Sequence, residues 1–345
     1  MLAIVAGISL KNLKPKVWDK TSSYYLPDLQ AIMVSYADFQ AMPYKRKMAM
    51  EQGLHAYLDV PQRIEIYLDN GSFYFMRRDG NTPTTEYEEF VKAAKPDWYP
   101  IPRDFIPTPK MGKVEQRSCF DRTMDINRAY DYDGYVPVVH ISSFLQQYAS
   151  AIKASKRLAA KPSLALGGIV PNLLRTQKAM PLADVLTHLR FVRGEFESKQ
   201  LHVFGIGGTA TIHIAALLRM DSIDSSGWRN RAARGIIQLF GSGDRMIADL
   251  GKWRGRKPSR KEWKKLRECC CPACIGFGVQ GLKGSGIEGF CNRACHNLWV
   301  LLEEATWIKE QLVAKRYSDL YKDRLDNSTY LPLIESLVKI SEGTI

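Results

Sequence analysis

Short apolar segments alternate with stretches of helical pattern from residue 31 to residue 225, and this alternation constrains the fold more than any other feature. In "RIEIYLD", residues 63–69, Ile64, Ile66 and Leu68 recur at period two, as in a buried strand. Six further segments are read as strands: "AIMVSYADF", "WYPIPRDF", "YVPVVHIS", "SLALGGIV", "LHVFGIGG" and "DSIDSS". Seven strand–helix units in a row predict an α/β fold with a parallel sheet and covering helices.

Two architectures fit this alternation. An eighth strand near "LRECCC", residues 266–271, would close a (β/α)₈ TIM barrel. The alternative is an open, doubly wound sheet, in which functional residues collect at one switch point. We favour the barrel because polar residues stand at the C-terminal ends of many different strands, and in a barrel all of these ends surround one pocket.

The residues at these strand ends define a candidate pocket. Asp69, Asp104, His140 and Asp224 each close or follow a strand, and the glycine pairs 167–168 and 205/207 close two others. Three carboxylates around one pocket repel one another, so some of them should have raised pKa values. A nucleophile and an acid/base pair require such differences.

Several of these residues also have a simpler interpretation, and a histidine at a strand end, such as His140, is more often structural than catalytic. Asp69 precedes Asn70-Gly71, which is ordinary turn chemistry. Gly168 and Gly205 could serve tight turns, or let the backbone approach a flat ligand. Phe73 and Phe204 could stack on that ligand, although phenylalanine more often packs in a core.

Six of the seven cysteines crowd one segment, which in a chain without an export signal favours a metal over disulfides. Cys269, Cys271 and Cys274 form C-x-C-x-x-C, with Cys270 expected to point away. A fourth ligand must come from "CNRACHNLW", which offers Cys291, Cys295 and His296. Zinc takes four S/N ligands in a closed structural site. An iron–sulfur cluster on Cys271, Cys274, Cys291 and Cys295 is the alternative.

The chain of 345 residues has a net charge of +13, which favours polyanionic partners such as nucleic acid. Basic residues gather in "WRNRAARG" and again from Lys252 to Glu268, where Trp253 and Trp263 are interleaved. A merely solvated surface is the alternative. The N-terminus lacks the features of a signal peptide, and no apolar run reaches the roughly 20 residues that span a bilayer. We therefore expect a soluble, cytoplasmic protein with no membrane partner, in a bacterial cell or a phage-infected host.

Several motifs in order resemble the tRNA-guanine transglycosylase superfamily. "KRKMAMEQGLHAYLDVPQRIEIYLDNGSFYF" resembles the helix and strand that lead to its Asp-Ser-Gly-Gly/Ser-Phe-Gln motif. "LALGGI" resembles its base-binding glycine strand, "VFGIGG" followed by "MDSIDSS" its nucleophile region, and "CCCPAC" with "HNLW" its C-x-C-x-x-C…His zinc site. The order matches from about residue 30 to about residue 310.

This resemblance implies a TIM barrel over residues 1–268, a zinc-binding subdomain over 269–300 and C-terminal helices over 301–345. It implies base exchange, with Asp224 as the nucleophile and Asp69 as the general acid/base. The remaining implied roles are base binding by Asp104, Gly168, Phe73, Phe204, His140 and Gly205, and structural Zn²⁺ binding by Cys269, Cys271, Cys274 and His296. His140 stands where the family usually has a glutamine.

The departures from the family pattern favour DNA as the substrate polymer. The motif has become "NGSFY", and "SSGWRNRAARG" replaces the "LPTR" and "RxG" that follow the nucleophile in bacterial tRNA enzymes. Such changes are typical of the branch that inserts 7-deazaguanines, such as 7-cyano-7-deazaguanine (preQ0), into the DNA of bacteria or phages. Double-stranded DNA would then contact the residues Arg229, Arg231, Arg234, Arg254 and Arg256. The alternatives are a tRNA-guanine transglycosylase of archaeosine or queuosine type and a non-catalytic, zinc-stabilised subunit that binds nucleic acid. Homodimers are common in the superfamily.

Overall fold

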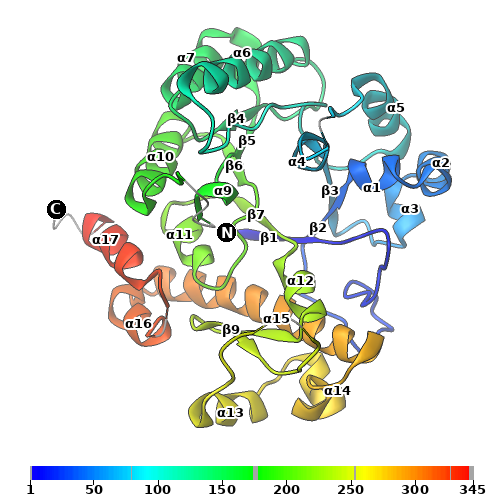
Figure 1. Ribbon diagram of the computed structural model, residues 1–345, viewed down its shortest axis with the longest axis vertical. Coiled ribbons are helices and arrows are strands. Elements are labelled where there is room, and N and C mark those ends of the chain that lie inside the picture. Colours follow the sequence, from blue (N-terminus) through cyan, green and yellow to red (C-terminus); the bar gives the residue numbers. More distant parts are fainter. Residues whose placement is uncertain (1, 79, 174–177, 252–253, 327, 342–345) are drawn as a thin grey trace.

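A computed structural model describes residues 2–78, 80–173, 178–251, 254–326 and 328–341. Its centre is a parallel seven-stranded sheet in the order β3-β2-β1-β7-β6-β5-β4 (Figure 1). The strands are β1 (Ala3–Gly7), β2 (Ala31–Ser35), β3 (Glu65–Asp69), β4 (Val138–His140), β5 (Ser163–Gly167), β6 (Gln200–Val203) and β7 (Ser222–Ser225). The sheet curls, which fits the predicted TIM-barrel class.

The gap between the two edge strands is bridged by residues 98–101. This segment forms single parallel bridges from Trp98 to Tyr67 in β3 and from Pro100 to Val136, just before β4. Backbone bonds on either side support them, from Leu68 N to Trp98 O (2.8 Å) and from Ile101 N to Val136 O (3.0 Å). Its prolines limit it to these few bonds, because proline donates none to a ladder.

The predicted eighth strand at residues 266–271 is wrong. Residues 266 and 267 end helix α13 (Arg260–Arg267), and residues 268–271 form the loop before the next helix. Helix α13 begins after Ser259, whose side chain accepts from the Glu262 N–H. The missing strand is instead β1, an apolar pentapeptide near the N-terminus that pairs between β2 and β7. It has no polar alternation because both of its faces are buried, as in other parallel strands.

Helices surround the sheet, and the C-terminal helices lie together on one side of it (Figure 1). The helices that follow the strands are α1 (Tyr36–Gln40), α2 (Pro43–Gln52), α3 (Leu54–Leu58), α4 (Ser72–Met76), α5 (Thr84–Ala94), α6 (Lys113–Ala129), α7 (Leu145–Ala154), α8 (Lys156–Ala160), α9 (Val170–Leu173), α10 (Leu182–Glu195), α11 (Thr211–Leu217) and α12 (Gly227–Ala233). A hairpin of β8 (Ile236–Leu239) and β9 (Gly243–Met246), absent from the sequence prediction, comes next. After α13 follow α14 (Pro272–Gly281), α15 (Gly286–Val313), α16 (Tyr317–Arg324) and α17 (Leu331–Ser341).

Two apolar cores hold these layers together. The larger core lies between the strands and the helices. The smaller one comprises Val5, Ala31, Met33 and Tyr67, with Trp98 and Phe204 packed against it, and so fills the interior of the barrel. This interior core forms the floor beneath the strand ends.

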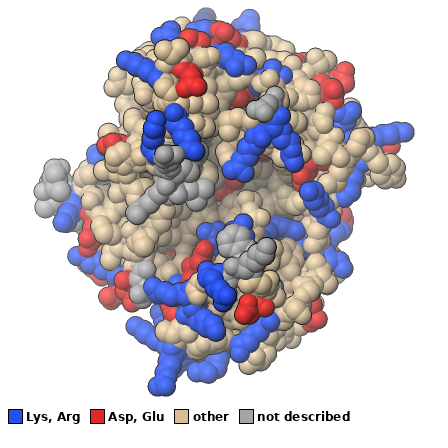
Figure 2. Space-filling view, viewed as in Figure 1, with Lys and Arg blue, Asp and Glu red and all other residues tan. Residues whose placement is uncertain are grey.

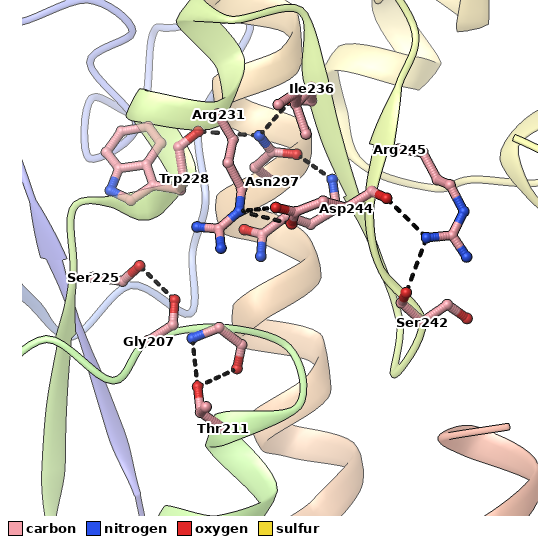
Figure 3. A network of polar contacts seen from close by, with 12 residues as sticks. Gly207, Thr211, Ser225, Trp228, Arg231, Ile236, Ser242, Asp244, Arg245 and Asn297 are labelled. Carbon is pink, nitrogen blue, oxygen red and sulfur yellow. Dashed lines mark hydrogen bonds and ion pairs between the residues drawn. The ribbon is translucent and has the colours of Figure 1, made fainter. Parts of the chain in front are cut away.

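Helix α15 joins the metal-binding segment to the C-terminal helices. It has 28 residues and packs along α11, α12, α14 and β8. Asn297 fastens it there: its side chain donates to the carbonyls of Trp228 and Ile236 and accepts from Gln238 N (Figure 3). The predicted boundary between residues 300 and 301 falls inside this helix. No described helix is long and apolar enough to cross a membrane.

Candidate active site and metal centre

A cavity of about 340 Å³ opens at the C-terminal ends of the strands. Eight residues predicted from the sequence line it: Asp69, Phe73, Asp104, His140, Gly168, Phe204, Gly205 and Asp224. They come from six different strand ends or the loops after them. The fold therefore brings together the residues that the sequence placed on one face.

Asp224 lies in β7, and its carboxylate is held from one side. Oδ1 accepts a hydrogen bond of 2.6 Å from the backbone N–H of Gly205. Gly205 has φ +76°, and a Cβ there would lie 2.3 Å from Val170 Cγ2. Only glycine can therefore present its N–H to Asp224 from this loop without strain.

Asp69 ends β3 and has an environment that favours its neutral form. Burial raises its pKa to about 6, and the charges of Asp224 and Asp104 add to the effect. Hydrogen bonds to Oδ2 from Ser35 Oγ (2.8 Å) and Gly71 N (3.1 Å) oppose the rise. Asp69 is thus both the first residue of a turn and a carboxyl that faces the cavity.

The pKa of Asp104 is shifted in the opposite direction. Burial raises its pKa, but the hydrogen bond and charge of His140, with further bonds from Asn70 and Ser72, outweigh burial and leave the pKa below its usual value. His140 Nε2 lies 2.9 Å from Oδ2, and Asn70 Nδ2 lies 2.8 Å from Oδ1. The two carboxyl groups of this cavity therefore have pKa values shifted in opposite directions, which is the arrangement that acid/base chemistry needs.

His140 is buried, with 1% of its surface exposed. A Cβ on Gly167 would lie 2.7 Å from His140 Nδ1, so this glycine makes room for the imidazole. Nδ1 has no hydrogen-bond partner among the described residues, although the residue lines the cavity. His140 is thus both a partner of Asp104 and a part of the cavity wall.

Phe73 and Phe204 stand at different depths. Phe73 in α4 is 39% exposed, with the Arg77 guanidinium 4.4 Å from its ring centroid. Phe204 is partly buried, with its centroid 4.8 Å from that of His202 and 6.1 Å from that of Trp98. Both rings line the cavity, and the interior core supports only Phe204.

Sequence reasoning missed three residues that shape the site: Ser35, Asn70 and His202. Ser35 ends β2 beside Asp69, and Asn70 binds Asp104 while also donating to the carbonyl of Ile101 (2.9 Å). Period two in "LHVFG" places His202 on the same face as Phe204. That signal was present in the sequence and went unused.

The four predicted zinc ligands form one cluster. The Sγ atoms of Cys269, Cys271 and Cys274 lie 3.5, 3.6 and 3.7 Å from His296 Nδ1, and all four ligand atoms lie within 4.8 Å of one another. His296 Nε2 lies 3.0 Å from the carbonyl oxygen of Gln238, which it can approach only as a donor. Nδ1 is thereby left as the metal-binding atom.

The donor set fits a structural zinc ion. Three thiolates and one imidazole fill a tetrahedral site and leave no open position. Cys270 is exposed and points to the carbonyl of Glu268, as expected. Cys291 and Cys295 lie outside the cluster, so the described geometry does not assemble the alternative set of four cysteines.

Two of the predicted nucleic-acid contacts have structural partners instead. Arg229 is 8% exposed and donates to the carbonyls of Lys14 (2.8 Å) and Asn12 (2.5 Å). Arg231 Nε lies 2.7 Å from both carboxylate oxygens of Asp244 (Figure 3). Both arginines fix α12 to its neighbours, so we withdraw them from the set that would contact phosphates.

The other three predicted contacts, Arg234, Arg254 and Arg256, are exposed. Lys252 and Trp253, in the same basic stretch, lie outside the described residues. Figure 2 shows Lys and Arg side chains on both sides of a hollow that crosses the middle of the visible face. A surface of this kind suits a polyanion.

Comparison with known proteins identifies distant relatives. The chain is 26% identical over 321 residues to the tRNA-guanine(15) transglycosylase of Pyrococcus abyssi, covering 86% of this chain and 50% of that protein. It is 25% identical over 327 residues to the protein of the same name from Thermococcus onnurineus, covering 87% and 51%. The chain thus spans about half the length of the curated relatives that it matches. A scan against known family models gave no match.

Proposed function

We propose that this chain is a guanine transglycosylase, which replaces a guanine base in a nucleic acid by a 7-deazaguanine such as 7-cyano-7-deazaguanine. The observation that carries the proposal is the pair Asp224 and Asp69 on one cavity, the first held for attack and the second with a pKa near 6. Distant homology to proteins named tRNA-guanine transglycosylases supports it.

In the first half-reaction, the carboxylate of Asp224 attacks C1′ of the target nucleotide. The C1′–O bond forms as the C1′–N9 bond breaks, and the guanine leaves with the bonding electrons. Protonated Asp69 gives its proton to the departing base, which becomes neutral. The product is a glycosyl ester on Asp224 and a carboxylate on Asp69.

In the second half-reaction, the incoming base loses its N9 proton to the carboxylate of Asp69. Its N9 attacks C1′, and the ester bond to Asp224 breaks. Two displacements retain the configuration at C1′, as in retaining glycosidases. Both aspartates return to their starting protonation states.

The other cavity residues suit a flat purine. Asp104 can accept hydrogen bonds from the N–H groups on the Watson–Crick edge of guanine, and its lowered pKa keeps it ionised for this role. Phe73 and Phe204 can stack on the base. The target nucleotide must first leave its base stack to reach the cavity.

A zinc ion bound by Cys269, Cys271, Cys274 and His296 would cross-link α14 and α15 to the loop before them. None of these residues lines the cavity. The ion would thus stabilise the fold and leave the base exchange to the aspartates.

For the polymer, we propose DNA. The sequence after the nucleophile, "SSGWRNRAARG", departs from the "LPTR" and "RxG" of the bacterial tRNA enzymes, and most of it forms α12. The names of the relatives favour the second candidate, tRNA. Net charge alone suits either polymer.

A base-exchange assay tests both levels of the proposal. Purified protein is given labelled guanine or 7-cyano-7-deazaguanine with duplex DNA in one tube and unmodified tRNA in another, and retained label is counted. Label in DNA that disappears in Asp224→Asn supports the full proposal, whereas label in tRNA alone restricts it to base exchange. Binding of nucleic acid without exchange in either tube would favour a non-catalytic subunit.

A further inference from the structure

A histidine that no step above uses lies directly beneath the nucleophile. His202 in β6 pairs with Ser222 in β7. Alternation along the strands puts His202 on the face of Phe204, and Ser222 on the face of Asp224. His202 is 2% exposed, and its ring lies against Tyr67 and Trp98 of the interior core, so it belongs to the barrel interior.

Both ring nitrogens of His202 face polar groups, but only one is satisfied. Nδ1 lies 2.8 Å from Ser222 Oγ. Nε2 lies 3.6 Å from Asp224 Oδ1 and has no hydrogen-bond partner among the described residues. Such buried orphan groups are rare in native proteins and call for an explanation.

Aromatic rings fix the orientation of this imidazole. The ring centroids of Tyr67, Trp98 and Phe204 lie 5.5, 4.9 and 4.8 Å from that of His202. A flip of the ring by 180° would exchange Nδ1 with Cδ2 and Nε2 with Cε1, and so place carbon atoms against Ser222 and Asp224. The packing therefore fixes the plane of the ring, and the bond between Nδ1 and Ser222 Oγ keeps Nε2 directed at the nucleophile.

The contact with Asp224 selects one tautomer. If Nδ1 carried the proton, the lone pair of Nε2 would face a carboxylate and be repelled. If Ser222 donates its hydroxyl proton to Nδ1, then Nε2 carries a proton that points toward Oδ1. The second arrangement completes the bond to Ser222 and turns an N–H toward the carboxylate, 3.6 Å away.

Two N–H donors then point toward the same carboxylate oxygen of Asp224. Gly205 N and His202 Nε2 both face Oδ1 of Asp224, and none of the described residues donates to Oδ2. We propose that His202 is a positioning residue that, with Gly205, holds Oδ1 so that Oδ2 forms the bond to C1′. The proposal rests on the proposed base exchange and names the attacking atom.

The first test reads the tautomer without any activity. Histidine is labelled with ¹⁵N, and the His202 signals are assigned by their loss in His202→Phe. We expect Nε2 to be protonated and Nδ1 to be a hydrogen-bond acceptor. A proton on Nδ1 alone overturns the proposal, and this result is independent of whether the protein exchanges bases.

The second test separates the donor from its packing. His202→Phe keeps a flat ring but removes the donor, whereas His202→Gln keeps an N–H donor. We expect kcat for base exchange to fall about 10- to 100-fold in His202→Phe, with KM for the free base within about threefold, and to recover in part in His202→Gln. Wild-type kcat in His202→Phe, or equal losses in both variants with a raised KM, would refute the positioning role.

Ser222→Ala supplies a check if His202→Phe fails to fold. It removes the group that orients Nδ1 and leaves the imidazole in place. We expect a smaller loss of kcat and a mixture of tautomers in the ¹⁵N spectrum. An unchanged spectrum with unchanged kcat counts against the proposal. If the wild type exchanges no base on either polymer, the proposed function fails, while the ¹⁵N spectrum still decides the geometry at Oδ1.

Discussion

Replacing Ser35 with alanine should move the pH at which Asp69 titrates. Ser35 Oγ donates to Asp69 Oδ2 at 2.8 Å and lowers a pKa that burial has raised to about 6. A hydrogen bond to a charged group contributes about 1.5–3 kcal/mol, and one pKa unit corresponds to about 1.4 kcal/mol. Cavity water can replace part of the lost bond. We therefore expect the lower end of the range, a rise of about one unit.

A rise in pH should affect the rates of the two half-reactions in opposite directions. Attack on the polymer requires protonated Asp69, so its kcat/KM should fall above about pH 6. Reaction of the incoming base requires the carboxylate, so its kcat/KM should fall at low pH. Its midpoint should lie below 6, because esterified Asp224 no longer raises the pKa of Asp69 by its charge.

The assay is the pH dependence of kcat/KM for polymer and for free base, measured from pH 4.5 to 8.5 in wild type and Ser35→Ala. Both midpoints should move upward by about one unit. Ser336→Ala is the control and should move neither midpoint, because Ser336 is an exposed serine of α17 whose Oγ donates to the carbonyl of Pro332. A polymer profile without an inflection near pH 6, or midpoints that Ser35→Ala leaves in place, would refute the assignment of Asp69.

Three other predictions concern stability, metal and polymer. Asp69→Asn should abolish exchange yet stabilise the fold at pH 7 by at most about 3 kcal/mol, since a pKa raised by about two units costs about 1.4 kcal/mol per unit. Because that cost arises only as pH rises from the unfolded pKa toward 6, the gain in the urea midpoint should vanish near pH 4. Elemental analysis should find one zinc per chain in wild type and Cys270→Ser and none in Cys271→Ser, and iron with sulfide would contradict the zinc assignment. The logarithm of the binding constant falls as the logarithm of the salt concentration rises. Arg254→Gln should make this slope less steep by about 0.9, whereas Arg231→Gln, which removes an ion-paired arginine, should leave it unchanged.

The sequence placed eight of the cavity residues on one face because they share a simple relation to the strands. Asp69 and Asp224 lie in or at the ends of apolar segments, and parallel strands bring their C-terminal ends to one side. The candidate zinc ligands were equally easy to predict from the sequence, because C-x-C-x-x-C places three thiolates in one tight loop. The missed elements had no such local signal: β1 lacks alternation, and the 98–101 segment is joined by single bridges.

The sequence by itself determined the candidate residues for chemistry, because residue type and position along a strand are local properties. The tertiary structure alone decided how they behave. The pKa of Asp69 depends on burial and on Asp104 and Asp224, which lie far from it in the chain. Whether an arginine is free for a phosphate or, like Arg229, is used by nearby carbonyls depends on which backbone the fold brings beside it. Charge and hydrogen bonding act through space, so only the packed chain fixes them.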